Sequence, residues 1–342
     1  MFEVWANLDL QCPLSKVAEE AQRAEALGFD VLAVPDLIHD GIACAAIAVH
    51  STRRIRITTS ALIAFPRSPM VVAVAAWDLH EASKGRFALG LGPQVRGNIV
   101  DRFSTPWTPP APRMREYVQA LRAIFAAWQR REPLRFEGDH YRFTRMQPYT
   151  SPQPLGHPEI PIRLSGIGPN MVALAGELAD GLNTHPTNAS PRYLRECVTP
   201  GLARGAARSE RPPEAVHILA NPLCATGIDD AAVRAQREEQ RALLATLYST
   251  PSYWPTLELY GWQQRGERLN DLVRDGRWEE MATLVDDAML DELVPSATYQ
   301  ALARQLADRY RGLAAAITYP LPTHRDDDPE VARAIEALKA AG

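Results

Sequence analysis

Cysteine is scarce in this chain of 342 residues, and its four cysteines lie far apart. Cys12, Cys44, Cys197 and Cys224 form no C-x-x-C pair, and no cluster of histidines accompanies them. A structural zinc site needs closely spaced ligands, and a disulfide-stapled domain needs a higher density of cysteine. The sequence therefore predicts neither a metal site nor a disulfide framework, and a reducing cytoplasm fits this cysteine usage best.

Long apolar runs and blocks of like charge are also missing. No stretch approaches the roughly 18 consecutive apolar residues of a membrane helix, and the first residues, MFEVWANLDL, show no positively charged leader. We therefore expect no membrane span and no secretory signal. The formal net charge is −4, and Arg is interspersed with Asp and Glu. This pattern disfavours nucleic acid as a partner.

The composition that remains is that of a globular protein. Hydrophobic residues make up 46% of the chain and charged residues 23%, both close to the average for folded domains. The chain is longer than most single domains, but α/β barrels often reach this length as one domain. We therefore expect residues 1–342 to form a single domain with one large hydrophobic core.

Segments typical of strands and of helices alternate along the chain. Alternation of this kind is characteristic of βαβ units and a parallel sheet. Eight such strands, each followed by a helical segment, predict a closed (β/α)₈ barrel, or TIM barrel. The expected strands are residues 2–10, 30–34, 55–63, 86–92, 161–166, 179–184, 217–225 and 314–320.

Two segments depart from this alternation. Residues 132–160 are predicted to form a loop with a small hairpin around FEGDHYRF, and residues 229–295 a long, mainly helical insertion after the seventh strand. Long connections in barrels usually carry functional loops. We therefore expect both insertions over the active face.

The active site of such a barrel lies at the carboxyl ends of its strands. The second expected strand is followed by PDLIHDG, which brings Asp36 and His39 to the barrel mouth. A carboxylate and an imidazole there can hold or transfer a proton during hydride chemistry. The alternative is that Asp36 caps the next helix and that His39 is merely exposed.

The third and fourth strands end in small residues. Ser60 and Ala61 would let a flat ring approach the backbone closely, although a tight barrel interior explains them equally well. The fourth strand ends in G-x-G at Gly92, which serves a backbone turn as readily as a ligand. A dinucleotide fingerprint would need a third glycine and a helix directly behind it.

A better phosphate site is expected in LSGIGPN, which follows the fifth strand and leads into a helix. Free N–H groups and the helix dipole favour an anion at such a helix start. The residues expected to bind it are Ser165, Gly166, Gly168 and Asn170. An ordinary turn with a proline at the first helical position is the alternative.

These motifs together resemble a known superfamily. The run ITTSALIAFPRSPMVVAVAAWDLHEASKGRFALGLGPQ resembles luciferase-like monooxygenases and coenzyme F-420-dependent oxidoreductases. LSGIGPNMVALAGELADGLNTHP and STPSYWPTLELYGW resemble a mycobacterial-type F-420-dependent branch. The resemblance implies a luciferase-like barrel with a cofactor ring over its mouth. It also implies a backbone bulge at Ser60–Ala61, often with a non-proline cis peptide, that supports the ring.

The resemblance assigns further roles to single residues. Asp36 matches an acidic residue that touches the ring in related deazaflavin enzymes. The next position, often a catalytic histidine in sugar-phosphate-oxidising relatives, is Leu37 here, so we expect His39 to reach the substrate instead. Gln94 stands where many relatives have a glutamate, and it is expected to contact the ring or the substrate rather than to act as an acid.

Three residues are expected around the substrate. His185 follows the sixth strand and is predicted to form a polar wall of the pocket. Tyr253 and Trp254 of the long insertion are predicted to belong to a lid, although aromatic residues of this kind often serve only packing.

The leading functional prediction is F-420-dependent hydride transfer to or from a small organic substrate. One alternative is a monooxygenase that uses reduced FMN delivered by a separate reductase. Another is a non-catalytic cofactor-binding barrel, because Leu37 and Gln94 replace two acid or base positions of relatives. A small-molecule substrate, a separate flavin or F-420 reductase and a second copy of the chain, in a homodimer, are the expected partners.

Overall fold

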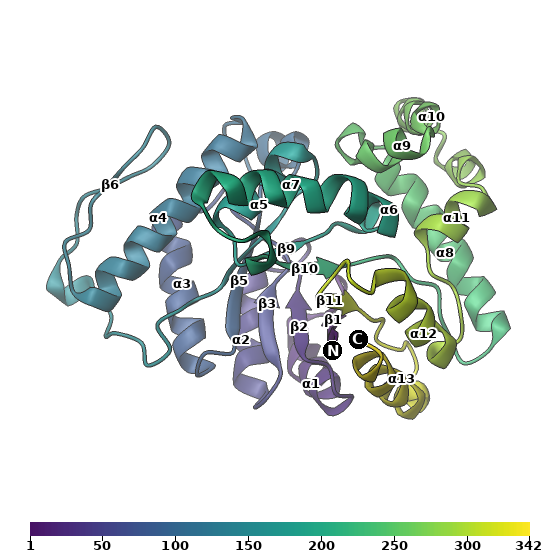
Figure 1. Cartoon of the computed structure of the whole chain (residues 1–342), viewed down its shortest axis with the longest axis horizontal. Helices are drawn as coiled ribbons and strands as arrows, with labels where there is room; N and C mark the ends of the chain where they lie inside the picture. The colour runs from purple at the N-terminus through teal and green to yellow at the C-terminus, as the bar shows by residue number, and fades with distance from the viewer.

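The computed structural model describes all 342 residues and has a closed parallel barrel at its centre (Figure 1). The strands follow the order β3-β2-β1-β11-β10-β9-β8-β5, and β5 also pairs with β3, which closes the ring. The predicted TIM barrel is therefore confirmed. Its strands are β1 (Glu3–Asn7), β2 (Val31–Val34), β3 (Arg56–Thr59) with its continuation β4 (Leu62–Ile63), β5 (Phe87–Gly92), β8 (Ile162–Ser165), β9 (Gly181–Asn183), β10 (His217–Ala220) and β11 (Ala316–Thr318).

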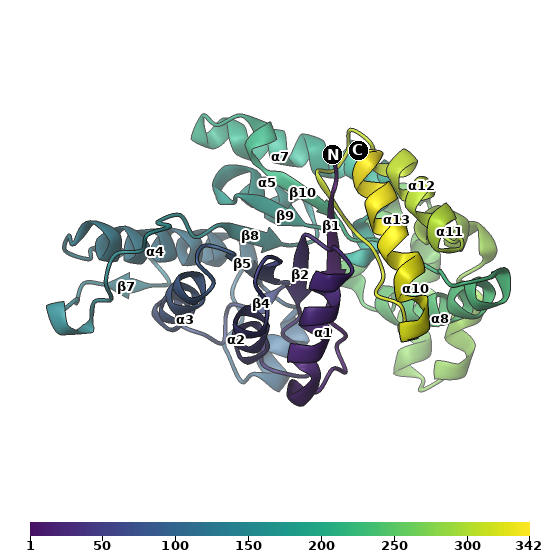
Figure 2. The same ribbon diagram turned by 90° about the horizontal axis from the view of Figure 1, so that it is seen from below.

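Helices surround the barrel and bury their apolar faces against it. Figure 2 shows α1 and α13 side by side, with both chain ends close together. The helices that follow the strands around the barrel are α1 (Leu14–Ala26), α2 (Gly41–Ser51), α3 (Pro69–Ala82), α4 (Pro110–Arg130), α5 (Pro169–Leu178), α6 (Pro191–Tyr193), α7 (Thr199–Ala206), α12 (Tyr299–Tyr310) and α13 (Asp328–Ala340). No helix is both long enough and apolar enough to cross a membrane.

Most strands are shorter than predicted, and two of them for a visible reason. Residues 55–63 form two strands, β3 and β4, because the chain bends between them at a cis peptide bond joining Ser60 to Ala61. Residues 217–225 are extended only as far as Ala220. Pro222 follows shortly afterwards and has no N–H to donate to a neighbouring strand. The position of the cis peptide agrees with the expectation from family resemblance.

The inside of the barrel is packed rather than open. Trp5, Val31, Ala33, Leu219 and Ala316 form a separate apolar cluster there. A much larger cluster fills the space between barrel and helices. Side chains therefore fill the barrel interior, as they do in barrels of this type.

The long insertion has a core of its own. The helices of the insertion are α8 (Asp230–Tyr248), α9 (Pro255–Tyr260), α10 (Gln263–Arg274) and α11 (Asp287–Leu293). Between them they bury Tyr248, Leu257, Leu269 and Met289. The Tyr248 hydroxyl donates to the carbonyl of Thr187, 2.8 Å away, just beyond β9. The insertion is thereby attached to the rim of the barrel.

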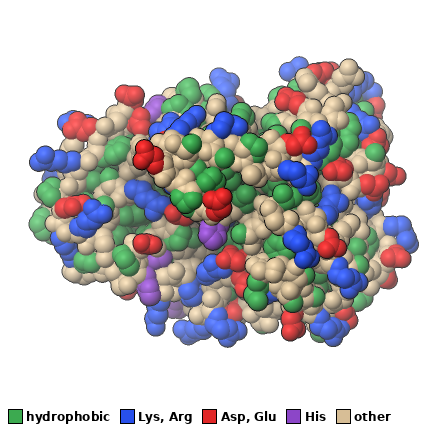
Figure 3. Space-filling view, viewed as in Figure 1, with side chains coloured by type: hydrophobic (Ala, Val, Ile, Leu, Met, Phe, Trp, Pro, Cys, Tyr) green, Lys and Arg blue, Asp and Glu red, His purple; other side chains and the backbone are tan.

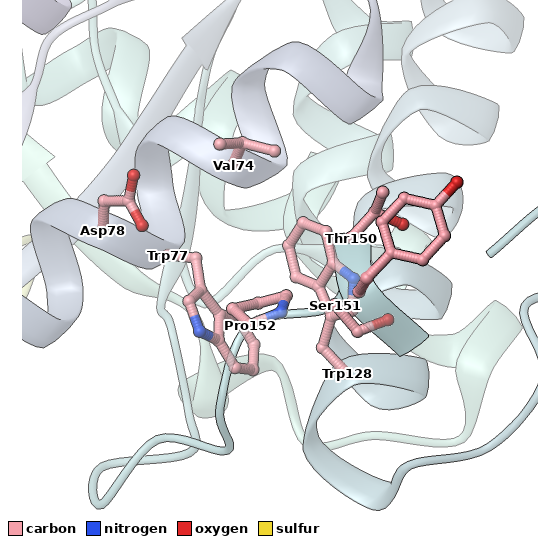
Figure 4. Close-up of a pocket in the computed structure, with 8 residues that line it drawn as sticks. Val74, Trp77, Asp78, Trp128, Thr150, Ser151 and Pro152 are labelled. Atoms are coloured by element: carbon pink, nitrogen blue, oxygen red, sulfur yellow. The ribbon is translucent and has the colours of Figure 1, made fainter. Parts of the chain in front are cut away.

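The 132–160 segment lies elsewhere than expected. Its hairpin, β6 (Phe136–Glu137) and β7 (Arg142–Phe143), packs on α4, where the Glu116 carboxylate accepts from the backbone N–H of His140. Farther on, the Trp77 indole of α3 donates to the carbonyl of Gln153. The segment therefore runs along the outside of α3 and α4 instead of across the barrel mouth, and it packs beside Trp77 and Trp128, which are buried (Figures 1 and 4).

Charges of both signs are mixed over the surface in Figure 3, and no large basic patch is visible on this face. Many of them pair locally, as Arg23 of α1 does with Asp328 of α13 at 2.6 Å. The pair joins the first and the last helix of the chain.

Candidate active site

Small side chains meet at the carboxyl ends of three neighbouring strands. A Cβ atom added to Gly92 would lie 3.2 Å from the Cβ of Ala61 and 3.9 Å from the Cβ of Ser165. Ser60 lies beside them, joined to Ala61 by the cis peptide bond. We call these four residues the small-residue floor. It leaves room over the barrel mouth for a flat ring to approach the backbone.

Hydrogen bonds fix the floor from below. The Ser60 N–H donates to the carbonyl of Val34 at 2.7 Å. The Thr59 hydroxyl bonds to both the carbonyl and the N–H of Gly90, at 2.7 and 2.9 Å. Gly90 itself must be glycine, since an added Cβ would lie 1.8 Å from the carbonyl oxygen of Thr59. Strands β3 and β5 are thus held in close contact just beneath the floor.

Asn183 and Arg163 support the floor from the other side. The Asn183 amide donates to Ser60 Oγ at 3.2 Å, and its Oδ1 accepts from Arg163 Nε at 2.7 Å. Arg163 can only donate, so it fixes which way the amide points. The guanidinium also lies 4.7 Å from the centre of the Trp5 ring. Burial lowers the pKa of Arg163 to about 10, which leaves it charged at neutral pH.

Asp36 is a structural anchor, because its carboxylate holds neighbouring segments of the chain together. Its side chain is only 5% exposed and pairs with Arg67, with Nη1 2.7 Å from Oδ2. Its two oxygens also accept from the N–H groups of Gly41 and Ile63, each at 2.9 Å. To act as the predicted proton carrier, Asp36 would first have to release these partners. The capping residue of α2 is Asp40, which accepts from the N–H of Ala43.

Asp40 completes this cluster at its exposed side. Its carboxylate accepts from Arg67 Nη2 at 2.9 Å. Burial on its own would raise the pKa of Asp40, but the bonds from Ala43 and Arg67 outweigh it and lower the pKa below its usual value. Arg67 therefore ties the loop after β2 to the segment after β4.

His39 and Gln94 lie on the loops that follow β2 and β5. His39 is half-buried, and its imidazole makes no hydrogen bond within the protein. Gln94 follows β5 with a left-handed backbone, φ 61°, and its Oε1 accepts from the N–H of Val95 at 2.8 Å. The amide NH₂ of Gln94 and both nitrogens of His39 therefore remain available to a ligand.

The expected phosphate-binding turn has the geometry of a helix start. Gly168 precedes α5 with a φ of 89°, a conformation that glycine adopts at little cost, and Pro169 is the first helical residue. Gly166 packs so closely that an added Cβ would lie 2.5 Å from the Cβ of Met171. The first N–H groups of α5 have no partner within the helix and can bind an anion. Asn170 is exposed beside them.

His185 and Tyr253 stack on each other where the insertion meets the rim. Their ring centres lie 4.5 Å apart and the planes are 11° from parallel. The imidazole Nδ1 is 2.7 Å from the Thr187 hydroxyl, which in turn donates to Asn188. The Asn188 amide donates to the Thr256 hydroxyl of α9. A chain of hydrogen bonds thus connects His185 to the insertion.

Trp254 does not share this position. Its indole N–H donates to the carbonyl of Tyr248 at 2.7 Å, and its ring lies against Gly266 of α10. The predicted lid role of Trp254 finds no support in these contacts, because they are packing contacts inside the insertion. Tyr253 is the aromatic residue of this pair that faces the barrel.

The environment of His185 predicts a pH-dependent stability. Burial lowers the pKa of His185 to about 4, whereas an unfolded histidine titrates near about 6.5. Between these values the unfolded chain binds more protons, so the free energy of unfolding falls as the pH falls. When the pH falls from about 7 to about 4.5, the free energy of unfolding of His185→Gln should therefore decrease by about 2 kcal/mol less than that of the parent.

Urea unfolding at the two pH values measures this difference. His50 is exposed on α2, and His50→Gln serves as the matched control that should keep the parent's pH dependence. Equal pH dependence in the parent and His185→Gln would contradict the prediction.

The protein is a (β/α)₈ barrel with a floor of small residues at its mouth. A family model described as luciferase-like monooxygenase matches residues 1–316. The chain therefore belongs to the luciferase-like monooxygenase family, whose members are oxidoreductases and monooxygenases that use F-420 or FMN.

Three comparisons illustrate the relationship. An uncharacterized protein of Mycobacterium tuberculosis is 40% identical over 300 residues, which cover 88% of each chain. A putative coenzyme F-420-dependent oxidoreductase of the same organism is 32% identical over 314 residues, covering 86% of this chain and 87% of the relative. The F-420-dependent tetrahydromethanopterin reductase of Methanopyrus kandleri superposes with a TM-score of 0.80 at 18% identity, covering 98% and 97%.

Proposed function

We propose that this protein is an F-420-dependent oxidoreductase that transfers a hydride to or from a small organic substrate. The observation that carries the proposal is the small-residue floor of Ser60, Ala61, Gly92 and Ser165. The 32% identity to a putative F-420-dependent oxidoreductase supports this cofactor over FMN.

The residues of the mouth fit a deazaflavin. A flat ring can lie on the floor, because the only side chains there are one or two heavy atoms long. The NH₂ group of Gln94 can donate to a ring oxygen, and the N–H groups at the start of α5 can bind the phosphate beyond Gly168. When bound, the deazaflavin supplies the hydride chemistry, and the protein supplies binding and orientation.

The remaining side chains orient the reactants and exclude water. Arg163 and Asn183 hold Ser60 in place, and Asp36 with Arg67 holds the loop that carries His39. The Tyr253 ring stacks on His185, just beyond the end of β9. His39 has both ring nitrogens free, so we assign the proton transfer to it rather than to Asp36.

Cofactor binding tests the proposal directly. We expect F-420 to bind the purified protein at micromolar concentration, followed by the change in its fluorescence, and FMN to bind more weakly. Tight FMN binding without F-420 binding would favour a reduced-FMN monooxygenase instead, because flavin has an oxygen-reactive nitrogen where deazaflavin has carbon. Binding of neither cofactor would contradict both enzymatic proposals.

A further inference from the structure

The hydrogen bond from Asn183 to Ser60 joins strands that are not neighbours in the sheet. Asn183 is the last residue of β9, whereas Ser60 stands between β3 and β4, and β5 and β8 separate them in the strand order. Asn183 Nδ2 donates to Ser60 Oγ at 3.2 Å. Asn183 is only 1% exposed, but Ser60 is half-buried. The donor of this bond is therefore sealed inside the barrel, and the acceptor remains within reach of a ligand at the mouth.

Arg163 determines which way the amide of Asn183 points. Its Nε donates to Asn183 Oδ1 at 2.7 Å, and its Nη2 donates to the carbonyl of His217 at 2.9 Å. A guanidinium has only donors, so the atom of Asn183 that faces it must be the oxygen. A flipped amide would set two donors against each other in the buried interior, which is costly. The NH₂ group therefore has to face Ser60.

The direction of these bonds determines what the Ser60 hydroxyl can do. A hydroxyl group has one proton to donate and lone pairs that accept. Ser60 Oγ already accepts from Asn183, and its own proton has no acceptor within the protein. A ligand that covers Ser60 has to offer a lone pair there, because a buried donor without a partner weakens binding. Ser60 thus acts toward the mouth as a donor.

Arg163 is a costly residue to keep in this place. It is 8% exposed and forms no ion pair, and its contacts are the amide of Asn183, the carbonyl of His217 and the ring of Trp5. A buried charge without a counter-charge destabilises the fold relative to well-packed apolar side chains. Fixing the direction of the hydrogen bonds is a role that an apolar residue could not fill.

We propose that Ser60 donates a hydrogen bond to the bound cofactor and that Arg163, acting through Asn183, is a positioning residue that fixes this direction. The inference rests on the proposed function, because it takes the deazaflavin as the ligand on the floor. It adds a requirement to that function, namely that the cofactor atom nearest the Ser60 hydroxyl is an oxygen or an unprotonated nitrogen.

Asn183→Asp reverses the direction of the bonds, and Ser60→Ala removes the donor. The aspartate keeps the shape of the side chain and still accepts from Arg163, but its second oxygen replaces the NH₂ group. The Ser60 proton then turns toward residue 183, and the mouth meets a lone pair instead of a donor. We expect each substitution to raise the Kd for F-420 about tenfold in a fluorescence titration. Urea unfolding should show no loss of stability in Asn183→Asp, because the new carboxylate pairs with Arg163.

A double variant separates the effect of direction from that of charge. Ser60→Ala/Asn183→Asp contains the new carboxylate but has no hydroxyl to turn, so its Kd should equal that of Ser60→Ala. Asn270 of α10 is half-buried and donates to the carbonyl of Ser249 at 2.8 Å, inside the insertion. Asn270→Asp is therefore the matched control, and it should bind F-420 like the parent.

Arg163→Met tests the positioning residue itself. Without the guanidinium the Asn183 amide can adopt both orientations, so we expect a smaller increase of the Kd, about threefold. This increase should disappear in the Ser60→Ala background. The visible absorption band of bound F-420 gives a second readout, because a hydrogen bond to the chromophore changes its electronic transition. The band should move in Ser60→Ala and Asn183→Asp and stay in place in Asn270→Asp.

The inference and the proposed function fail in different ways. F-420 binding as tight as the parent's in folded Ser60→Ala or Asn183→Asp would overturn the inference and leave the proposed function standing. An equal effect of Asn183→Asp with and without the Ser60 hydroxyl would do the same. If the parent binds FMN instead of F-420, the proposed function is wrong, and the same variants titrated with FMN decide whether Ser60 is a donor. A parent that binds neither cofactor contradicts both.

Discussion

Gly92→Val is expected to weaken binding of the cofactor strongly while the barrel stays folded. An added Cβ at this position already lies 3.2 Å from the Cβ of Ala61, and the two methyl groups of valine would extend over the floor. The backbone at Gly92 is an ordinary strand conformation, which valine adopts readily. We expect the Kd for F-420 to rise on the order of 100-fold, or about 2.7 kcal/mol, in a fluorescence titration.

A second glycine provides the control. Gly156 lies in a loop at a distance from the mouth, and an added Cβ there would meet nothing within 4 Å. Gly156→Val should therefore bind F-420 like the parent. Circular dichroism checks that both variants are folded, and Gly92→Ala, with its single methyl group, gives a milder version if valine disturbs the barrel. Unchanged F-420 binding by a folded Gly92→Val would show that the floor is not the cofactor site.

The barrel could be predicted because its strands carry a local signal. Apolar, β-branched segments such as residues 55–63 and 86–92 stand between helical segments, and this alternation suffices to predict a parallel barrel. Hydrophobic periodicity does not reveal the interruption between β3 and β4 within residues 55–63, because apolar residues continue on both sides of it. Only the family resemblance indicated a cis peptide at Ser60–Ala61.

The site was predictable in position but less so in the roles of its residues. Asp36 was expected at the mouth because it follows a strand, and the structure places it there. Its partner Arg67 lies 31 residues further along, so the ion pair depends on tertiary contacts that one sequence does not reveal.

Arg163 and Asn183 were missed for a similar reason. They stand within short apolar strands, and only the folded barrel brings their two side chains into contact. A charged residue in a strand buried on both faces is the one signal that could have drawn attention to Arg163.

The anchoring role of Asp36 leads to the second large prediction. Asp36→Ala removes the partner of Arg67 and leaves the N–H groups of Gly41 and Ile63 without an acceptor. Loss of one member of a buried ion pair typically costs about 3–5 kcal/mol, and we expect a decrease of this size in urea unfolding. Asp40→Ala is the matched control, since Asp40 binds the same arginine but is 53% exposed. Loss of its helix cap should cost about 1 kcal/mol.

Asp36→Asn then separates an anchor from a proton carrier. The amide keeps the shape of the side chain but loses the charge that pairs with Arg67, so an anchor should lose stability and F-420 affinity together. The N–H of Ile63 binds Asp36 just two residues after the cis peptide, and movement of this contact reaches the floor directly. A proton carrier would instead lose kcat while the free energy of unfolding and the Kd for F-420 stayed at the parent's values. That second outcome would indicate that Asp36 transfers a proton, and it would contradict its role as a structural anchor.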